Sequence, residues 1–268
     1  NMPDNFRVLF IGDIVGRPGR RALSRFLPEL KKKCRPSLVI ANGENAAGGI
    51  GLTEEIAREL LLQVDVLTSG NHIWDKKEVF NYLEKEPRLI RPANYPEGNP
   101  GHGYHLFENE DGIKAAILNL QGRVFMEPVD CPFRRAEKEL EAILPLTPTI
   151  IIDFHAEATS EKQALGWFLD GKVSAIIGTH THTQTADERI LPGGTAYISD
   201  VGMAGGLNSV IGMKPEQALN RFLTARPQKF EPASEGLLLG AVLVEIDPQN
   251  GKALTIERQM LVEDDFEN

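Results

Sequence analysis

The chain has 268 residues, and 41% of them are hydrophobic. It is therefore long enough to bury a large core, and α/β domains of this size commonly remain undivided. The formal net charge of −9 argues against nonspecific binding of long nucleic acid, because such binding relies on a basic surface. The two cysteines, Cys34 and Cys131, have no metal-like spacing and are expected to be reduced thiols.

The chain shows no linker, repeat or low-complexity run, so we predict a single domain over residues 1–268. No segment resembles a signal peptide, and no apolar run is long enough to span a bilayer. We therefore expect a cytoplasmic protein without a membrane partner. Asn1 precedes Met2 and is interpreted as an expression remnant, and the oligomeric state stays open, a homo-oligomer included.

The hydrophobic pattern predicts an α/β protein in two halves. In the first half we expect strands at 7–11, 38–41 and 66–69, with helices at 19–33, at 53–63 and after Asp75. A hairpin of strands 103–107 and 113–120 follows, turned by Glu110-Asp111-Gly112. In the second half we expect helices at 134–144, 160–170 and 215–223, and strands at 150–154, 174–178, 237–246 and 253–261.

Two of these helix starts carry the pattern of a capping box, in which an N-cap side chain is followed three residues later by Glu or Gln. Asp75 pairs in this way with Glu78, and Ser160 pairs with Gln163. We therefore predict that Asp75 caps a helix and is not a metal ligand.

Five of the apolar, strand-like runs are directly followed by polar side chains that can bind metal. These side chains are Asp13; Glu44 and Asn45; Asn71 and His72; His155; and His180 and His182. Because ligands bind outside the carboxyl ends of the strands in an open α/β sheet, the five segments can converge. If residues 178–182 stay extended, both histidines of that segment share a face.

Each of these signals has an ordinary structural explanation when taken singly, because Gly-Asp and Gly-Asn are favoured in turns and an isolated histidine can be a hydrogen-bonded core residue. Their occurrence at five strand ends favours one common site. Carboxylates, amides and imidazoles without thiolate suit manganese, iron or zinc. Because these ligands are too many for one ion, we predict two metals that share a bridging carboxylate.

Seven segments carry a family resemblance: 10–20 (FIGDIVGRPGR), 42–47 (NGENAA), 70–77 (GNHIWDKK), 91–94 (RPAN), 119–123 (NLQGR), 153–160 (DFHAEATS) and 178–182 (GTHTH). The order of their candidate ligands resembles that of the calcineurin-like metallophosphoesterases. The residues within each segment resemble those of the YmdB-like bacterial phosphodiesterase branch. Most of the superfamily has Asp-x-His at the first site and Gly-Asp at the second. Here Val15 and Glu44 stand at those positions, departures that are typical of the YmdB-like branch.

The resemblance implies an α/β fold of metallophosphoesterase type, a four-layer α-β-β-α sandwich in which helices flank two central mixed sheets. It also implies two transition-metal ions, iron or manganese in preference to zinc. The implied ligands are Asp13, Glu44, Asn45 and His182 for the first ion and Asn71, His155 and His180 for the second, with Glu44 bridging. His72 is expected to point away from the metals by strand alternation and to act as general acid. Arg123 could contact phosphate or base, or form a surface salt bridge.

The implied activity is dinuclear-metal-dependent hydrolysis of cyclic nucleotide monophosphates, 2',3'-cyclic or 3',5'-cyclic, by attack of a metal-bridging hydroxide. A small anionic substrate is compatible with the negative chain because two metal ions dominate the potential at the site. Two alternatives stay open. One is a phosphomonoesterase of 5'-nucleotidase type, and the other is a regulatory protein that senses metal or nucleotide with slow turnover and acts through a partner or RNA.

Overall fold

Two mixed β-sheets form the centre of the protein, in a computed structural model that describes residues 5–264. The strands of the first sheet are β1 (Phe6–Ile11), β2 (Asp13–Ile14), β3 (Leu38–Asn42), β4 (Val66–Thr68), β11 (Met203–Gly205), β12 (Leu237–Ile246) and β13 (Ala253–Glu263). Their order is β2-β11-β12-β1-β3-β4, and β13 also pairs with β12. β1 runs parallel to β3 and antiparallel to β12, which makes the sheet mixed.

The second sheet is built from β5 (Tyr104–Glu108), β6 (Lys114–Gln121), β7 (Ile150–His155), β8 (Ala175–Thr179), β9 (Arg189–Ile190) and β10 (Ala196–Ile198). Their order is β5-β6-β7-β8-β10-β9. The four inner strands are parallel, and β5 and β9 pair antiparallel at the two edges.

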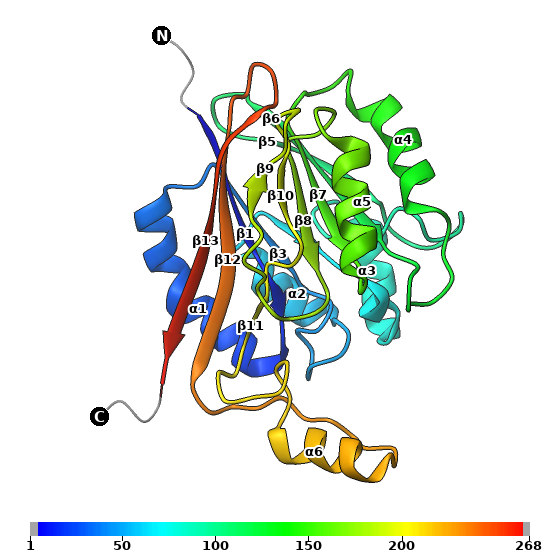
Figure 1. Cartoon of the computed structure of the whole chain (residues 1–268), viewed down its shortest axis with the longest axis vertical. Helices are drawn as coiled ribbons and strands as arrows, with labels where there is room; N and C mark the ends of the chain where they lie inside the picture. Colours follow the sequence, from blue (N-terminus) through cyan, green and yellow to red (C-terminus); the bar gives the residue numbers. More distant parts are fainter. Residues whose placement is uncertain (1–4, 265–268) are drawn as a thin grey trace.

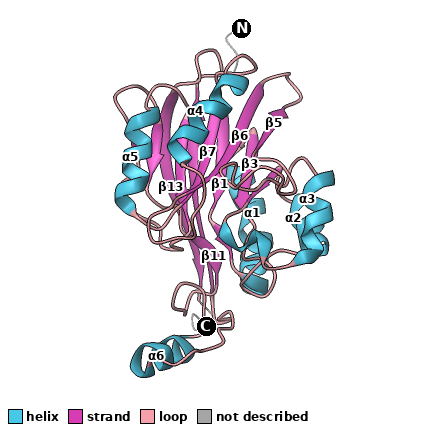
Figure 2. Cartoon of the chain, turned by 90° about the vertical axis from the view of Figure 1, so that its right-hand side faces the viewer, coloured by secondary structure: helices cyan, strands magenta, loops and turns pink. Residues whose placement is uncertain are grey.

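The helices are α1 (Gly16–Cys34), α2 (Glu54–Leu61), α3 (Phe80–Lys85), α4 (Pro132–Ile143), α5 (Thr159–Leu169) and α6 (Pro215–Thr224), with short 3-10 helices η1 (Asn71–Trp74) and η2 (Lys77–Val79). Side chains of α1, α2 and α3 share a core with the first sheet, and those of α4 and α5 share another with the second. α6 lies apart from the sandwich in both views (Figure 1 and Figure 2).

A third core fills the space between the sheets, and strand periodicity explains how one strand serves two cores. On β1, Val8 and Phe10 belong to the core between the sheets, whereas Leu9 and Ile11 belong to the core beneath the helices. Both faces of such a strand are buried, which is why it reads as a continuous apolar run. The predicted four-layer α-β-β-α sandwich is confirmed.

Most predicted elements agree with the structure within a few residues, and the differences have local causes. β2, β9, β10 and β11 were not predicted, because strands of two or three residues show no periodicity. The helix predicted after Asp75 is preceded by η2 and becomes α-helical only at Phe80. The predicted cap at Ser160 is wrong, because α5 begins one residue earlier and its N-cap, Ala158, makes no side-chain cap bond.

Within residues 5–264, no helix is both long and apolar enough to cross a bilayer. The expectation for Asn1 lies outside the described residues.

Candidate metal centre

The seven predicted metal ligands lie together where strand ends of the two sheets meet. The first sheet supplies Asp13 at the start of β2, and Glu44, Asn45 and Asn71 after β3 and β4. The second sheet supplies His155 at the end of β7, and His180 and His182 in the segment after β8. Contacts of 3.4 Å or less link all seven in one cluster. The expected convergence of five sequence segments is therefore what the fold produces.

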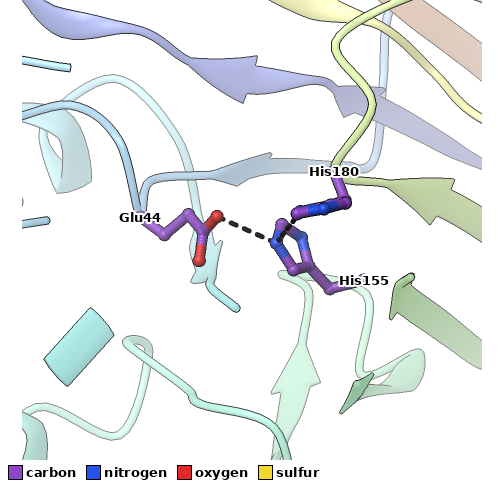
Figure 3. Close-up of side chains that lie close together, drawn as sticks. All are labelled: Glu44, His155 and His180. Atoms are coloured by element: carbon purple, nitrogen blue, oxygen red, sulfur yellow. Dashed lines mark hydrogen bonds and ion pairs between the residues drawn. The ribbon is translucent and has the colours of Figure 1, made fainter. Parts of the chain in front are cut away.

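His155 occupies the middle of one half of this cluster. Its Nε2 lies 2.8 Å from Oε1 of Glu44, 3.2 Å from Oδ1 of Asn71 and 3.1 Å from Nδ1 of His180. Figure 3 shows Glu44, His155 and His180 pointing toward one another. Donor atoms of these three residues lie within 4.8 Å of one another, a spacing suited to a shared metal ion.

His182 organises the other half of the cluster. Its Nε2 lies 3.3 Å from Oδ2 of Asp13 and 3.2 Å from Nδ2 of Asn45, and that amide lies 3.4 Å from Oε1 of Glu44. Glu44 thus contacts members of both halves, the position that a bridging carboxylate requires.

Buried oxygen atoms without hydrogen-bond donors show what the cluster lacks. Both carboxylate oxygens of Asp13 and Oδ1 of Asn45 are buried and accept no hydrogen bond in the described part of the chain. An unsatisfied buried polar atom is costly, and a buried carboxylate needs a partner of opposite charge. Oxygen and imidazole donors arranged around such orphaned atoms fit a hard or borderline metal cation.

The pKa values of the cluster show how strongly its buried carboxylates and imidazoles act on one another. Burial would raise the pKa of Asp13, but its contact with His182 and the charges of the neighbouring imidazoles lower it to about 2. Burial would lower the pKa of His155, yet the charge and hydrogen bond of Glu44 raise it to about 9. Burial and the charge of His155 lower the pKa of His180 to about 4. The carboxylate of Glu44 thus favours the protonated form of His155 although burial opposes it. A metal cation would compete with that proton for the ring nitrogen.

A buried polar chain behind His155 fixes the orientation of its ring. Thr179 Oγ1 donates to Oδ1 of Asp153 at 2.6 Å and lies 2.9 Å from Nδ1 of His155. Since the single hydroxyl proton goes to Asp153, Nδ1 of His155 donates to Thr179, and Nε2 is left to face the cluster. Asn42 and Thr68 also donate to Asp153, and Asn42 accepts a hydrogen bond from the backbone of Glu44.

The segment that carries His180 and His182 is not extended, so the prediction of two residues on one face of a strand is wrong in its geometry. β8 ends at Thr179, and the φ values of His180 and His182 are 100° and 65°. Left-handed backbone at residues other than glycine costs about 1–3 kcal/mol each and needs tertiary support. Both histidines reach the cluster by this turn of the chain.

A buried ion pair supplies that support. Lys162 on α5 donates through Nζ to the carbonyl of Thr179 at 2.9 Å and to Oδ2 of Asp200 at 3.0 Å. The same oxygen of Asp200 accepts from the backbone N–H of Thr181 at 2.9 Å. The pair therefore holds the backbone on both sides of His180.

Ile211 fixes the second histidine of this segment. Nδ1 of His182 donates to the Ile211 carbonyl at 2.8 Å, which leaves Nε2 for the cluster. Ile211 has a φ of 47°, a rare left-handed conformation for a β-branched residue.

The predicted general acid, His72, lies in η1 and not on a strand, so strand alternation does not explain its direction. Its backbone N–H donates to Oε2 of Glu44 at 2.9 Å, and its ring Nδ1 lies 2.6 Å from Oδ2 of Asp75. The prediction that Asp75 caps a helix is wrong, because this carboxylate instead orients His72. His72 lines a cavity of about 500 Å³ together with Glu44, His180 and His182.

Arg123 is the one predicted site residue that the structure does not bring to the cluster. It is exposed, it does not line this cavity, and its backbone N–H donates to Glu161. A contact between Arg123 and phosphate stays a prediction.

Sequence reasoning missed the residues that support the ligands: Asp75, Asp153, Thr179, Lys162, Asp200 and Ile211. One of them carried a usable signal, because Asp153 is a charged residue inside the apolar run of β7. Most of the others contact residues that are distant in sequence. Asp75 contacts the nearby His72, but its position also matched a capping box, which led to the wrong prediction.

Comparison with known proteins agrees with this geometry. The family model of YmdB-like proteins matches residues 9–259. A 2',3'-cyclic-nucleotide 2'-phosphodiesterase of Bacillus subtilis (strain 168) is 51% identical over 260 residues, covering 97% of this chain and 98% of that protein. A crystal structure of a hypothetical protein from Thermus thermophilus has a TM-score of 0.90 at 43% identity, covering 96% of this chain and 100% of that one. The structure of a novel phosphatase from Mycoplasma pneumoniae has a TM-score of 0.91 at 38% identity, covering 99% of this chain and 96% of that one.

Proposed function

Because the chain belongs to the YmdB-like protein family, we propose that it is a metal-dependent phosphodiesterase that hydrolyses cyclic nucleotide monophosphates. The name of the Bacillus subtilis relative, 51% identical over almost the whole chain, supports a 2',3'-cyclic substrate. The single observation that carries the proposal is a buried cluster of metal-binding side chains beside a histidine that Asp75 orients. Oxygens of Asp13 and Asn45 in that cluster accept no hydrogen bond among the described residues, and Glu44 and Asn45 line one cavity together with His72.

We assign two ions of iron or manganese to the cluster. Asp13, Asn45 and His182 would hold one ion, Asn71, His155 and His180 would hold the other, and Glu44 would contact both. When bound, such a pair supplies an activated water and neutralises charge on the phosphate. The seven side chains fit this role because they combine oxygen and imidazole donors without thiolate.

The remaining chemistry belongs to His72. In the imidazolium form of His72, Nδ1–H donates to Asp75 and Nε2–H is left free to donate to the substrate. As water attacks phosphorus it releases one proton to solvent, the bond from phosphorus to one ribose oxygen breaks, and that oxygen takes the Nε2 proton. The backbone bond from His72 to Glu44 ties this acid to the ligand that contacts both halves of the cluster.

The charge of the cavity favours diesters over monoesters. Arg221 is the only Lys or Arg among the described residues that line it. A phosphomonoester carries about two negative charges near neutral pH, because the second pKa of a phosphate ester lies near 6. A cyclic diester carries one charge, so it needs fewer cationic side chains than a monoester does.

The test is a substrate panel on metal-loaded protein. We expect 2',3'-cyclic AMP and bis-p-nitrophenyl phosphate to be hydrolysed faster than p-nitrophenyl phosphate and 5'-AMP under matched metal and pH. The reverse order would refute the diesterase proposal and favour the nucleotidase. Turnover of none of the four would favour a regulatory protein.

A further inference from the structure

One wall of the cavity beside the metal centre comes from a segment outside the sandwich, residues 207–235, which we call the arm. The arm contains α6, the helix that stands apart from the two sheets in Figure 1 and Figure 2. Its two sides are joined at the base by hydrogen bonds from Asn208 N to Glu235 O at 3.1 Å and from Ala233 N to Gly212 O at 2.9 Å. These hydrogen bonds fix the base of the arm to a defined backbone geometry.

The cavity has two chemically different sides. The sandwich contributes the polar side, with Glu44, His72, His180 and His182. The arm contributes mostly apolar surface, from Val210, Ile211, Met213, Phe222 and Phe230. Phe222 is 83% exposed and Ile211 is 53% exposed, so large apolar groups face solvent next to the candidate catalytic centre. Exposed apolar surface that continues into a polar site is typical of ligand binding.

We propose that the arm is a nucleobase subsite, in which the base of the substrate stacks on Phe222 while its cyclic phosphate faces the metal ligands. The inference rests on the proposed function and adds the residues that hold the base. The cavity volume of about 500 Å³ lies within the usual range for small-ligand pockets, roughly 300–1,000 Å³. A flat heterocycle gains favourable contact by stacking on an aromatic side chain.

The chemistry of the arm also predicts how selective the subsite is. Arg221 is the one polar side chain that the described arm contributes to the cavity. Stacking accepts any base, because every base has a π-face, whereas strong selection needs several hydrogen-bonding groups aimed at the base edge. We therefore infer that purine and pyrimidine substrates are turned over with kcat/KM values within roughly tenfold of each other.

Ile211 connects this subsite to the metal centre. Its side chain lines the cavity, and its carbonyl accepts the hydrogen bond from Nδ1 of His182. One residue therefore contributes to the apolar wall of the cavity and also orients a candidate metal ligand.

The experiment uses a matched pair of neighbours on α6. Phe222 and Leu223 are equally exposed at 83%, but Leu223 does not line the cavity. Phe222→Ala, Phe222→Trp and Leu223→Ala are compared with wild type on 2',3'-cyclic AMP and on glycerol 1,2-cyclic phosphate, a cyclic diester without a base. We expect Phe222→Ala to raise KM for 2',3'-cyclic AMP by about five- to 100-fold, the span of one base-stacking contact. Phe222→Trp and Leu223→Ala should both keep KM for 2',3'-cyclic AMP near the wild-type value.

Turnover of glycerol 1,2-cyclic phosphate should be the same in all four proteins, which separates base binding from damage to the metal site. Calorimetric titration with 3'-AMP should show the same order of affinities without turnover. Equal KM values for Phe222→Ala and Leu223→Ala, or a preference of 1,000-fold for one base, would overturn the subsite while leaving the diesterase proposal standing. If wild type hydrolyses neither cyclic diester, the proposed function fails and the subsite fails with it.

Discussion

Lys162→Met should be among the most damaging single substitutions in this protein, although it lies outside the proposed metal and substrate contacts. Lys162 and Asp200 are 2% and 1% exposed, and their ion pair measures 3.0 Å. Methionine keeps the length and apolar stem of lysine, so the change removes charge and hydrogen bonds with little change in volume. It leaves Asp200 buried without its cation and frees the Thr179 carbonyl.

Breaking a buried pair by removing one partner costs about 3–5 kcal/mol of unfolding free energy. With a melting shift of about 2–4 °C per kcal/mol for a domain near this size, Tm should fall by roughly 6–20 °C. Because the pair holds the backbone around His180, the variant should also bind less metal. The double variant Lys162→Met with Asp200→Asn should recover part of the loss, since no unpaired charge remains.

The pH dependence of this loss has a definite sign. Burial raises the pKa of Asp200 even with Lys162 beside it, and removal of that cation can only raise it further. A group whose pKa is higher in the folded than in the unfolded protein favours folding at low pH and loses that contribution as pH rises through the folded pKa. The deficit of Lys162→Met relative to wild type should therefore be smaller at pH 5 than at pH 8.

The assay is thermal and urea unfolding, with metal content measured in parallel. Lys138→Met is the matched control, because Lys138 also lies on a helix and pairs with Glu97 at 3.4 Å, but with side chains 66% and 83% exposed. Its loss should be about 0–1 kcal/mol. A Tm for Lys162→Met within 2 °C of that control would refute the reasoning from burial.

Three further predictions concern the metal and the acid. Glu44→Ala should release both ions, measured as metal per chain, and one zinc retained after the substitution would contradict the two-metal assignment. His72→Ala should keep the metals and lower turnover of 2',3'-cyclic AMP by roughly 10²–10⁴, but affect bis-p-nitrophenyl phosphate much less, because nitrophenolate leaves without a proton; equal losses on both substrates would argue against an acid. Thr179→Val should weaken metal affinity by about 10- to 100-fold in a chelator competition, whereas Thr179→Ser should not, because His155 loses its Nδ1 acceptor only in the first; wild-type affinity in the valine variant would exclude this support.

Local patterns in the sequence predicted the α/β class and the gathering of metal-binding side chains at five strand ends, whereas the four-layer sandwich and the assignment of seven ligands came from the family resemblance. Short, continuous apolar runs mark the strands that are buried on both faces, and the carboxyl ends of parallel strands lie at one edge of a sheet. Asp13, Glu44 and His155 each follow or end such a strand. The position of these residues therefore follows from the strand pattern, and no knowledge of tertiary contacts is needed.

The features of the site that the sequence did not predict depend on tertiary contacts, or on a side chain that could make either of two local hydrogen bonds. Lys162 and Asp200 hold the backbone around the left-handed His180, and no local pattern records that pair. Asp75 matched the capping pattern, but its carboxylate hydrogen-bonds to His72, three residues earlier. The helix of the arm was predicted at 215–223, but its place beside the cavity depends on tertiary contacts.

The proposed metal ions would cross-link the two sheets, because the candidate ligands come from both. Glu44 follows a strand of the first sheet and His155 ends a strand of the second, so neither sheet carries a complete set of donors. Metal affinity therefore reports how the two sheets sit against each other. Phe10→Leu or Ile177→Val would alter the packing of the core between the sheets without removing a candidate ligand. Loss of metal in such variants would indicate that the two sheets had shifted relative to each other before the protein unfolded.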